Sequence, residues 1–277
     1  MSEELTLSVL LASSTLKDPI SKLVSPSAEV IGNTFGELWE LTFSGFLLYC
    51  EKKKLQRMAD LESFKDSLVD NASKIPPDYL AEPALSIIGP AFEASKYYFE
   101  ESELREMFSS LIVSSMDTRV SHLTHPSFAG VITQLSVLDA EFLTHISETS
   151  TQTIPVVGGE IIVHGKKLTK SPYFEGLTQK QSTHGDASAI SVSLSSLSRL
   201  GLISCDYSAP LLPETKYDWV ESHPEMSRIR AHYDKQCTNA PFETELNIIK
   251  GFAAITPFGR TFCKVCVPHD LFTVFVS

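Results

Sequence analysis

The spacing of apolar residues changes near Glu148, and this change limits the folds open to the chain. Up to Glu148, apolar residues recur every three or four positions, as on one face of an α-helix. Beyond it, short β-rich runs alternate with glycines and polar stretches, a pattern typical of strands. We therefore expect a mainly α-helical protein with a small β component, of the α+β class.

Helical stripes cover most of the first half of the sequence. We expect a tail at 1–26 and a helical domain at 27–120. The first stripe begins near Ala28 and continues into the charged stretch that follows Tyr49. The second covers 61–72 and ends where two prolines follow, because the residue before a proline disfavours the α region.

Two further helices complete this domain. One is expected over 83–99, where Pro90 predicts a kink or a break at Gly89. The other runs from Ser102 to Met116, with a regular apolar face.

Two capping boxes mark later helix starts. Ser136 with Asp139 three residues on predicts a helix, because each can bond the other's backbone N–H. Ser222 with Glu225 shows the same spacing and predicts a second such start. Both helices carry apolar residues at helical spacing beyond the cap.

Between these two helices the β-rich runs begin. Two of them flank Gly158-Gly159 and predict a hairpin near 154–164 with the glycine pair as its turn. The following polar stretch at 165–186 is expected to be irregular.

The order of elements after residue 186 is that of a winged helix. A helix at 187–199 ends at Gly201, which suits a left-handed cap. A strand at 202–205, a return strand at 246–255 and a closing helix from Thr256 follow. With the helix from Ser136 completing a helix-turn-helix core, we expect a winged-helix-like domain at 121–277. A long insert near 207–243 separates its two wing strands.

The charge of the chain argues against nucleic-acid binding. The net charge is −11, and residues 121–277 hold 12 basic and 15 acidic residues. Binding to phosphates requires clustered Lys and Arg, and the one such run is Lys52–Lys54 followed by Arg57. The apolar stretch Val30–Tyr49 carries two glutamates, so we expect at most a surface contact with a membrane. Five cysteines and no basic leader predict a reduced, cytoplasmic protein.

Several ordered segments resemble a known family. Over about residues 28–266 the chain is similar to the abortive infection alpha (Abi-alpha) family. The resemblance implies a bacterial cytoplasmic protein associated with anti-phage defence, and it implies no catalytic residues. The polar stretch 149–186 departs from the pattern. The segments that carry the resemblance are Ile75-Pro76-Pro77, Glu82-Pro83, Ile88-Gly89-Pro90, Ala94, Tyr97, Glu103–Phe108, His125–Phe128, Gln134–Ser136, Asp139-Ala140, Leu200–Ile203, Ile255–Gly259 and Phe262.

No segment predicts a catalytic, cofactor or metal site. Cys263 and Cys266 have ligand-like spacing, but no second pair follows, and buried thiols explain them better. His122 and His125 lie near Asp117, yet the histidine before Pro126 is better explained as a helix-entry residue. Zinc-protease, nucleophile-elbow and phosphate-loop motifs are missing from the sequence. We therefore expect no cofactor and no small-molecule ligand.

The remaining hypothesis is a surface for protein partners or for self-association. The outer face of the helix at 187–199 bears serines and one arginine, a poor set for reading bases. Aromatic residues in the insert favour a protein interface, although packing on their own domain is an equal alternative. Two other interpretations stay open, a winged-helix DNA-binding regulator and a cryptic toxin enzyme. The candidate surface consists of Ser188, Val192, Ser195, Arg199, Tyr217 and Trp219.

Overall fold

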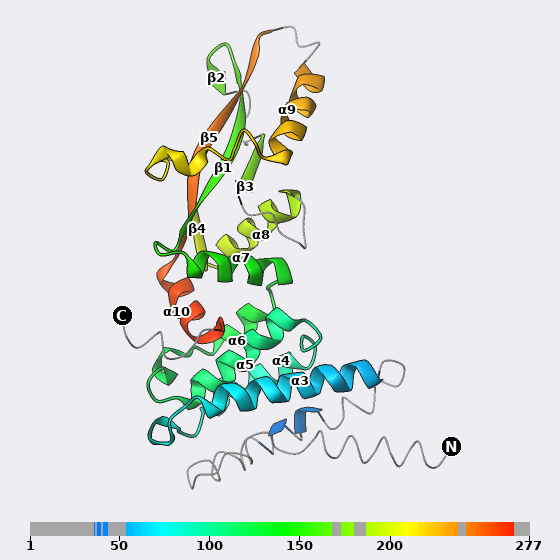
Figure 1. Ribbon diagram of the computed structural model, residues 1–277, viewed down its shortest axis with the longest axis vertical. Coiled ribbons are helices and arrows are strands. Elements are labelled where there is room, and N and C mark those ends of the chain that lie inside the picture. Colours follow the sequence, from blue (N-terminus) through cyan, green and yellow to red (C-terminus); the bar gives the residue numbers. More distant parts are fainter. Residues whose placement is uncertain are drawn as a thin grey trace, which may run out of the picture. The chain divides into compact units, whose positions relative to one another are not determined.

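The structure is a computed structural model (Figure 1). It describes residues 36, 38, 39, 41–43, 54–167, 173–179, 187–237 and 242–268. The expected tail at 1–26 and most of the expected first helix lie outside the described residues, as do parts of the polar stretch at 165–186. The chain divides into two compact units, Met1–Leu135 with Thr261–Ser277, and Ser136–Arg260.

The first unit is helical, and α5 (Ser102–Met116) is its central helix. It contacts α3 (Lys54–Ser73), α4 (Leu85–Ser95) and α6 (Ser127–Ile132). Ten of its 15 residues are buried, and they include the small polar residues Ser109, Ser114 and Ser115. A helix that is buried on nearly every side belongs in the core, so α5 organises the unit.

Aromatic rings fill the core of this unit. Trp39 and Phe43 are fully buried, with ring centroids 4.6 Å apart, and Trp39 stacks on Phe64 of α3 at 5.9 Å. Phe92 of α4 meets Trp39 edge-on at 6.1 Å. Two short 3-10 helices, Pro77–Tyr79 and Ser121–Leu123, precede α4 and α6.

The helix predictions for this unit need correction in α3 and α4. Helix α3 is continuous from Lys54 to Ser73, so no separate helix begins at 61 as expected, and α4 is shorter than the expected 83–99. The helix over Ser102–Met116 is confirmed at both ends. Helix α4 continues through Pro90 and ends at Ser95, so the predicted break at Gly89 is wrong. The proline lies on the exposed side of the helix, where the missing backbone hydrogen bond can be replaced by water.

The second unit contains an antiparallel sheet with the order β2-β1-β5-β4. Its centre is a long ribbon in which β1 (Thr153–Val163) pairs with β5 (Thr244–Ile255) from one end to the other. The short strands β2 (Lys166–Lys167) and β3 (Phe174–Thr178) pair with β1 as well. Since β5 occupies one edge of β1, both must lie along the opposite edge.

The predicted turn at Gly158-Gly159 is wrong, because both glycines lie inside β1. A Cβ on Gly159 would stand 2.2 Å from Cε1 of Phe174 in β3, so the glycine makes room for that ring. The chain instead turns at His164 and Gly165, with φ of 47° and 72°. Positive φ at two successive positions is the two-residue hairpin turn that suits strand twist.

Two helices and a short strand accompany this ribbon. Helix α7 (Val137–Glu148) begins at Ser136, and the predicted capping box with Asp139 is confirmed. Helix α8 (Ala187–Arg199) contacts α7, β3 and β4 (Ile203–Asp206). As predicted, β4 pairs antiparallel with the return strand β5, over four residues. Most of β5, however, pairs with β1, which no sequence pattern indicated.

The insert contains a 3-10 helix at Glu214–Tyr217 and helix α9 (Pro224–Cys237). The second predicted capping box is wrong. The Ser222 hydroxyl donates to the Trp219 carbonyl at 3.0 Å, and the Glu225 N–H donates to Nδ1 of His223 at 3.2 Å. The side chain that accepts a free backbone N–H in the first turn of α9 is therefore that of His223.

A tight junction joins the end of α8 to the start of α10 (Pro257–Cys266). The Thr256 hydroxyl donates to the Gly201 carbonyl at 2.5 Å and accepts the Gly259 N–H at 2.9 Å. The Thr256 N–H donates to the Leu202 carbonyl at 3.0 Å. Gly201 has φ of 73°, as its predicted left-handed cap requires. Two segments that are far apart in sequence thus share one set of hydrogen bonds.

Candidate interaction surface

The outer face of α8 is the first part of the candidate surface. Ser188, Val192, Ser195 and Arg199 follow one another at helical spacing, and all four are exposed. Val192 is 68% exposed. Ile190, Leu194 and Leu197 lie on the opposite, buried face. The helix is amphipathic, with small hydroxyl groups around a single apolar side chain on its outer face.

The two aromatic residues of the predicted surface lie elsewhere, which is a correction. Tyr217 is 3% exposed, and its hydroxyl donates to the Gly251 carbonyl at 2.7 Å. The hydroxyl also accepts the Leu211 N–H at 2.8 Å. Trp219 is half-buried against the core cluster of Val157, Leu177, Tyr217, Val220 and Met226. Both rings therefore pack on their own domain, which is the alternative that the sequence left open.

A groove runs along the flank of α8 that faces β3 and α9, and consists of two adjoining hollows. One has a volume of about 310 Å³ and the other about 360 Å³, within the range of ligand sites in proteins. Glu175 and Ser191 belong to both. The first hollow is lined by Phe174, Glu175, Leu177, Ser188, Ser191, Glu225 and Ile229. The second is lined by Glu175, Gly176, Ser191, Leu194, Ser195, Ser198, Cys205 and Tyr207.

Tyr207 forms one wall of the second hollow. Its side chain lies against the sheet, close to Gly158, Gly176 and Gly251. A Cβ on Gly251 would stand 2.7 Å from Cδ1 of Tyr207, and one on Gly158 would stand 3.4 Å from its Cε1. The Tyr207 hydroxyl accepts the N–H of Gly176 at 3.0 Å. Burial raises the pKa of Tyr207 to about 12, so its hydroxyl keeps its proton at neutral pH.

The groove is acidic. Glu175 is exposed and makes no ion pair with another described residue. Glu225 is held by Arg228, with 2.5 Å between its Oε1 and the guanidinium Nη1. Among the residues that the structure describes, no Lys, Arg or His lines either hollow. Burial, with a smaller effect of Glu175, raises the pKa of Cys205 to about 11, so this thiol is not a reactive thiolate.

The sequence pattern indicates the serine edge of this groove but not its opposite wall. Ser188 and Ser195 are predicted surface residues, and both line the groove. No pattern points to Glu175, and Tyr207 is indicated only as one of the aromatic residues of the insert. The signal for Tyr207 lies in the glycines, because a glycine inside a strand marks a place where another group approaches closely.

His223, next to the groove residue Glu225, gives a prediction on pH. Burial of the imidazole lowers its pKa from the ordinary 6.5, against a smaller opposing effect of Glu225. The stability it contributes is thus complete above 6.5 and is lost as pH falls through the folded-state pKa. We expect the free energy of unfolding to fall as the pH is lowered below about 6.5, and His223→Gln to make this fall shallower. Urea unfolding across this range, with an NMR titration of the imidazole, measures both. A His223 titration midpoint at or above the ordinary value would contradict the prediction.

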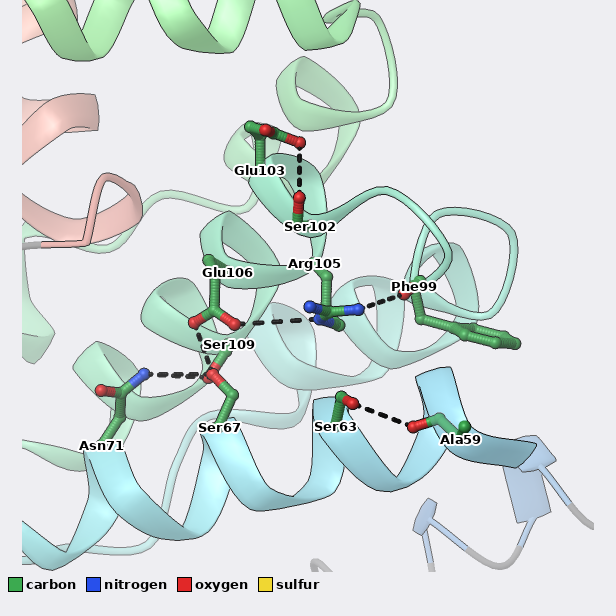
Figure 2. Close-up of polar contacts among 10 residues, drawn as sticks. All are labelled: Ala59, Ser63, Ser67, Asn71, Phe99, Ser102, Glu103, Arg105, Glu106 and Ser109. Atoms are coloured by element: carbon green, nitrogen blue, oxygen red, sulfur yellow. Dashed lines mark hydrogen bonds and ion pairs between the residues drawn. The ribbon is translucent and has the colours of Figure 1, made fainter. Parts of the chain in front are cut away.

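In the first unit, a polar seam between α3 and α5 is a second candidate site (Figure 2). The Ser67 hydroxyl lies 2.6 Å from Oε2 of Glu106 and 3.0 Å from Oγ of Ser109. Asn71 donates to Ser109 at 3.1 Å, and Nη1 of Arg105 donates to the Phe99 carbonyl at 3.1 Å. Nε of Arg105 lies 3.8 Å from Oε1 of Glu106 and has no hydrogen-bond partner among the described residues. The two serines, Asn71 and Glu106 bond to one another, so the seam joins two helices.

The other sequence candidates have structural roles. Nδ1 of His125 accepts the Ser127 N–H at 3.1 Å at the start of α6, as expected for a helix-entry residue. Cys263 and Cys266 are buried, and burial raises the pKa of both thiols. Within the described ranges, no three His, Cys, Asp or Glu side chains are placed to hold a metal ion. In the same ranges, no helix is long and apolar enough to cross a membrane.

Comparison with known protein families gives a match over most of the chain. A family model described as "Abortive infection alpha" matches residues 56–266. Those residues include α4, α5, α7, α8, the sheet and the junction between Gly201 and Thr256. No curated protein and no solved structure matches the chain.

Proposed function

This chain belongs to the abortive infection alpha family, and from that membership we propose that it serves in abortive infection. In this role it would act inside a bacterial cell in response to phage. The matched region contains most of the helical unit's core, from α3 onward, and the whole of the groove-bearing sheet. We assign the cytoplasm as its compartment, which agrees with the free thiols of the four described cysteines.

We further propose that the chain acts by contact with a protein, through the outer face of α8. The observation that carries this proposal is Val192, 68% exposed at the centre of a face bordered by serines. The serines are small and leave the valine accessible, and the exposed valine supplies apolar area that a partner protein can bury. In this proposal α7, α8 and the β4–β5 pair form a winged-helix-like module that is used for protein recognition.

The charge around α8 favours a protein over DNA as the partner. Residues 121–277 carry a net charge of −3, so little would be gained from releasing counterions. Of the four outer-face residues, Arg199 alone carries a group that discriminates bases by paired hydrogen bonds. Serine and valine suit a protein surface better than a base edge.

A pair of matched substitutions tests this proposal. Val192→Glu places a carboxylate on the outer face of α8, and Ala231→Glu places one at an exposed position of α9. We expect Val192→Glu to abolish protection, so that plating of a phage panel returns to the level on cells without the chain. Ala231→Glu should leave protection intact. Thermal unfolding midpoints equal to that of the unaltered chain would show that both variants fold.

The outcomes separate the role from the surface. Protection by the unaltered chain that survives Val192→Glu would overturn the α8 contact and leave the defence role standing. Unchanged plating of every phage on cells that express the unaltered chain would overturn the defence role. Salt-sensitive binding of duplex DNA that depends on Arg199 would overturn the protein contact in favour of a DNA-binding regulator.

A further inference from the structure

We propose that the groove between α8, β3 and α9 binds an extended, basic peptide segment of the partner protein. The inference deepens the proposed function and rests on it, because it names the chemistry of the segment that α8 would meet. Three features of the groove carry it, namely its length, its apolar floor and its uncompensated acidic charge.

The length of the groove suits a short extended segment. Its wall on α8 runs from Ser188 through Ser191 and Ser195 to Ser198. Ten residues of helix rise about 15 Å. An extended chain advances about 3.3 Å per residue, so about four or five residues of a partner would fill this length. Both hollows are open to solvent and share Glu175 and Ser191, so one continuous chain can lie along them.

The floor of the groove suits the aliphatic part of a long side chain. Leu177 and Leu194 are buried and line the first and second hollow respectively, and Phe174 and Ile229 pack against the core cluster that contains Leu177. Lys and Arg lay their methylene groups on such surfaces and extend the charged end toward water or an acid. Tyr217 belongs to the same cluster as Leu177, and Trp219 packs against that cluster.

The charge of the groove selects a cation. Glu175 is common to both hollows, and Glu225 borders the first. Arg228 pairs with Glu225 from outside the lining, whereas Glu175 has no ionic partner among the described residues. A guanidinium or ammonium group beside Glu175 would supply the missing charge, and the serine hydroxyls on α8 can accept its remaining hydrogens.

The test measures binding of labelled pentapeptides to the full chain by fluorescence anisotropy. The probes are fluorescein-labelled, end-capped peptides of sequence Ala-Arg-Leu-Arg-Ala and Ala-Glu-Leu-Glu-Ala. We expect the basic peptide to bind, with an affinity that falls as salt is added, and the acidic peptide not to bind. Glu175→Gln should weaken binding by about fivefold, and Ser191→Leu, which fills the point shared by both hollows, by at least that factor.

Glu243→Gln is the matched control, because it neutralises an exposed carboxylate that lines neither hollow. It should leave the affinity unchanged. Equal binding of both peptides, or an equal loss with Glu175→Gln and Glu243→Gln, would overturn the proposal. Displacement of the basic peptide by spermidine at equal concentration would overturn it too, because a simple amine would then satisfy the groove without a peptide backbone.

Failure of this inference is distinguishable from failure of the proposed function. Lost phage protection in Val192→Glu with no binding of either peptide would keep the α8 contact and discard the groove. Peptide binding that follows Glu175, together with unchanged plating, would keep the groove and discard the defence role.

Discussion

Gly259→Ala is expected to lower the free energy of unfolding of the second unit by about 3 kcal/mol or more. A Cβ at Gly259 would stand 1.9 Å from the carbonyl oxygen of Leu202 and 2.8 Å from its carbonyl carbon. Both are backbone atoms, and the Leu202 carbonyl oxygen accepts hydrogen bonds from the N–H and the hydroxyl of Thr256. A rotamer change cannot relieve the contact, so the junction between α8 and α10 must open, and overpacking of this kind costs about 1–3 kcal/mol or more.

Gly130→Ala is the matched control for that substitution. Gly130 lies in α6, and a Cβ there would meet nothing within 4 Å. Alanine in place of a helical glycine should leave stability unchanged or raise it by up to about 1 kcal/mol. Urea unfolding followed by circular dichroism measures both variants. A Gly259→Ala protein as stable as the unaltered chain would show that the approach of Leu202 is not required.

Asp117→Ala is expected to cost the first unit about 3 kcal/mol, as breaking a buried ion pair does. The Asp117 side chain is 1% exposed, and it accepts the Arg119 N–H at 3.0 Å and Nε at 2.9 Å. These hydrogen bonds also raise the pKa of Arg119, so the guanidinium stays charged and would be left without its acid. Arg119 in turn lies 5.0 Å from the centre of the Tyr79 ring.

The loss of stability should be concentrated where the ion pair of Asp117 and Arg119 joins the segment after Pro76 and Pro77 to the end of α5. The Ala81 N–H donates to the Met116 carbonyl at 2.8 Å, and the Thr118 N–H donates to the Tyr79 carbonyl at 2.9 Å. We expect hydrogen exchange at Ala81 and Thr118 to accelerate in Asp117→Ala. Asp78→Ala, at an exposed position of the same segment, should change the unfolding free energy by less than about 0.5 kcal/mol. Equal effects of the two substitutions would refute the role given to the pair.

Local rules in the sequence predicted the helices well. The bounds Ser102–Met116, the cap at Ser136 and the left-handed Gly201 all depend on residues within one helical turn. Such features are decided by backbone geometry and near neighbours, which a sequence records directly. The prediction of a mixed α and β chain follows from the same periodicities.

The errors arose where a distant segment decides the outcome. Gly158-Gly159 matched a hairpin turn, but the ring of Phe174 and the pairing with β5 hold both glycines in a strand. The Ser222 capping box matched by spacing, but the buried His223 occupies the capping position instead. Tyr217 was expected at a surface, because nothing near it in sequence shows that Gly251 will receive its hydroxyl proton.

One part of the candidate site likewise follows from local sequence, and the other part depends on distant segments. The outer face of α8 follows from helical spacing alone, so the sequence suffices to predict Ser188, Val192, Ser195 and Arg199 as one exposed row. The groove beside it also needs β3, α9 and Tyr207, and the pairing of β1 with β3 and β5 is part of what places them beside α8. The sequence was enough to predict features that depend on a single helix or a single turn. The order of the strands and the groove depend on contacts between segments tens of residues apart, and no local pattern in the sequence encodes the pairing of such segments.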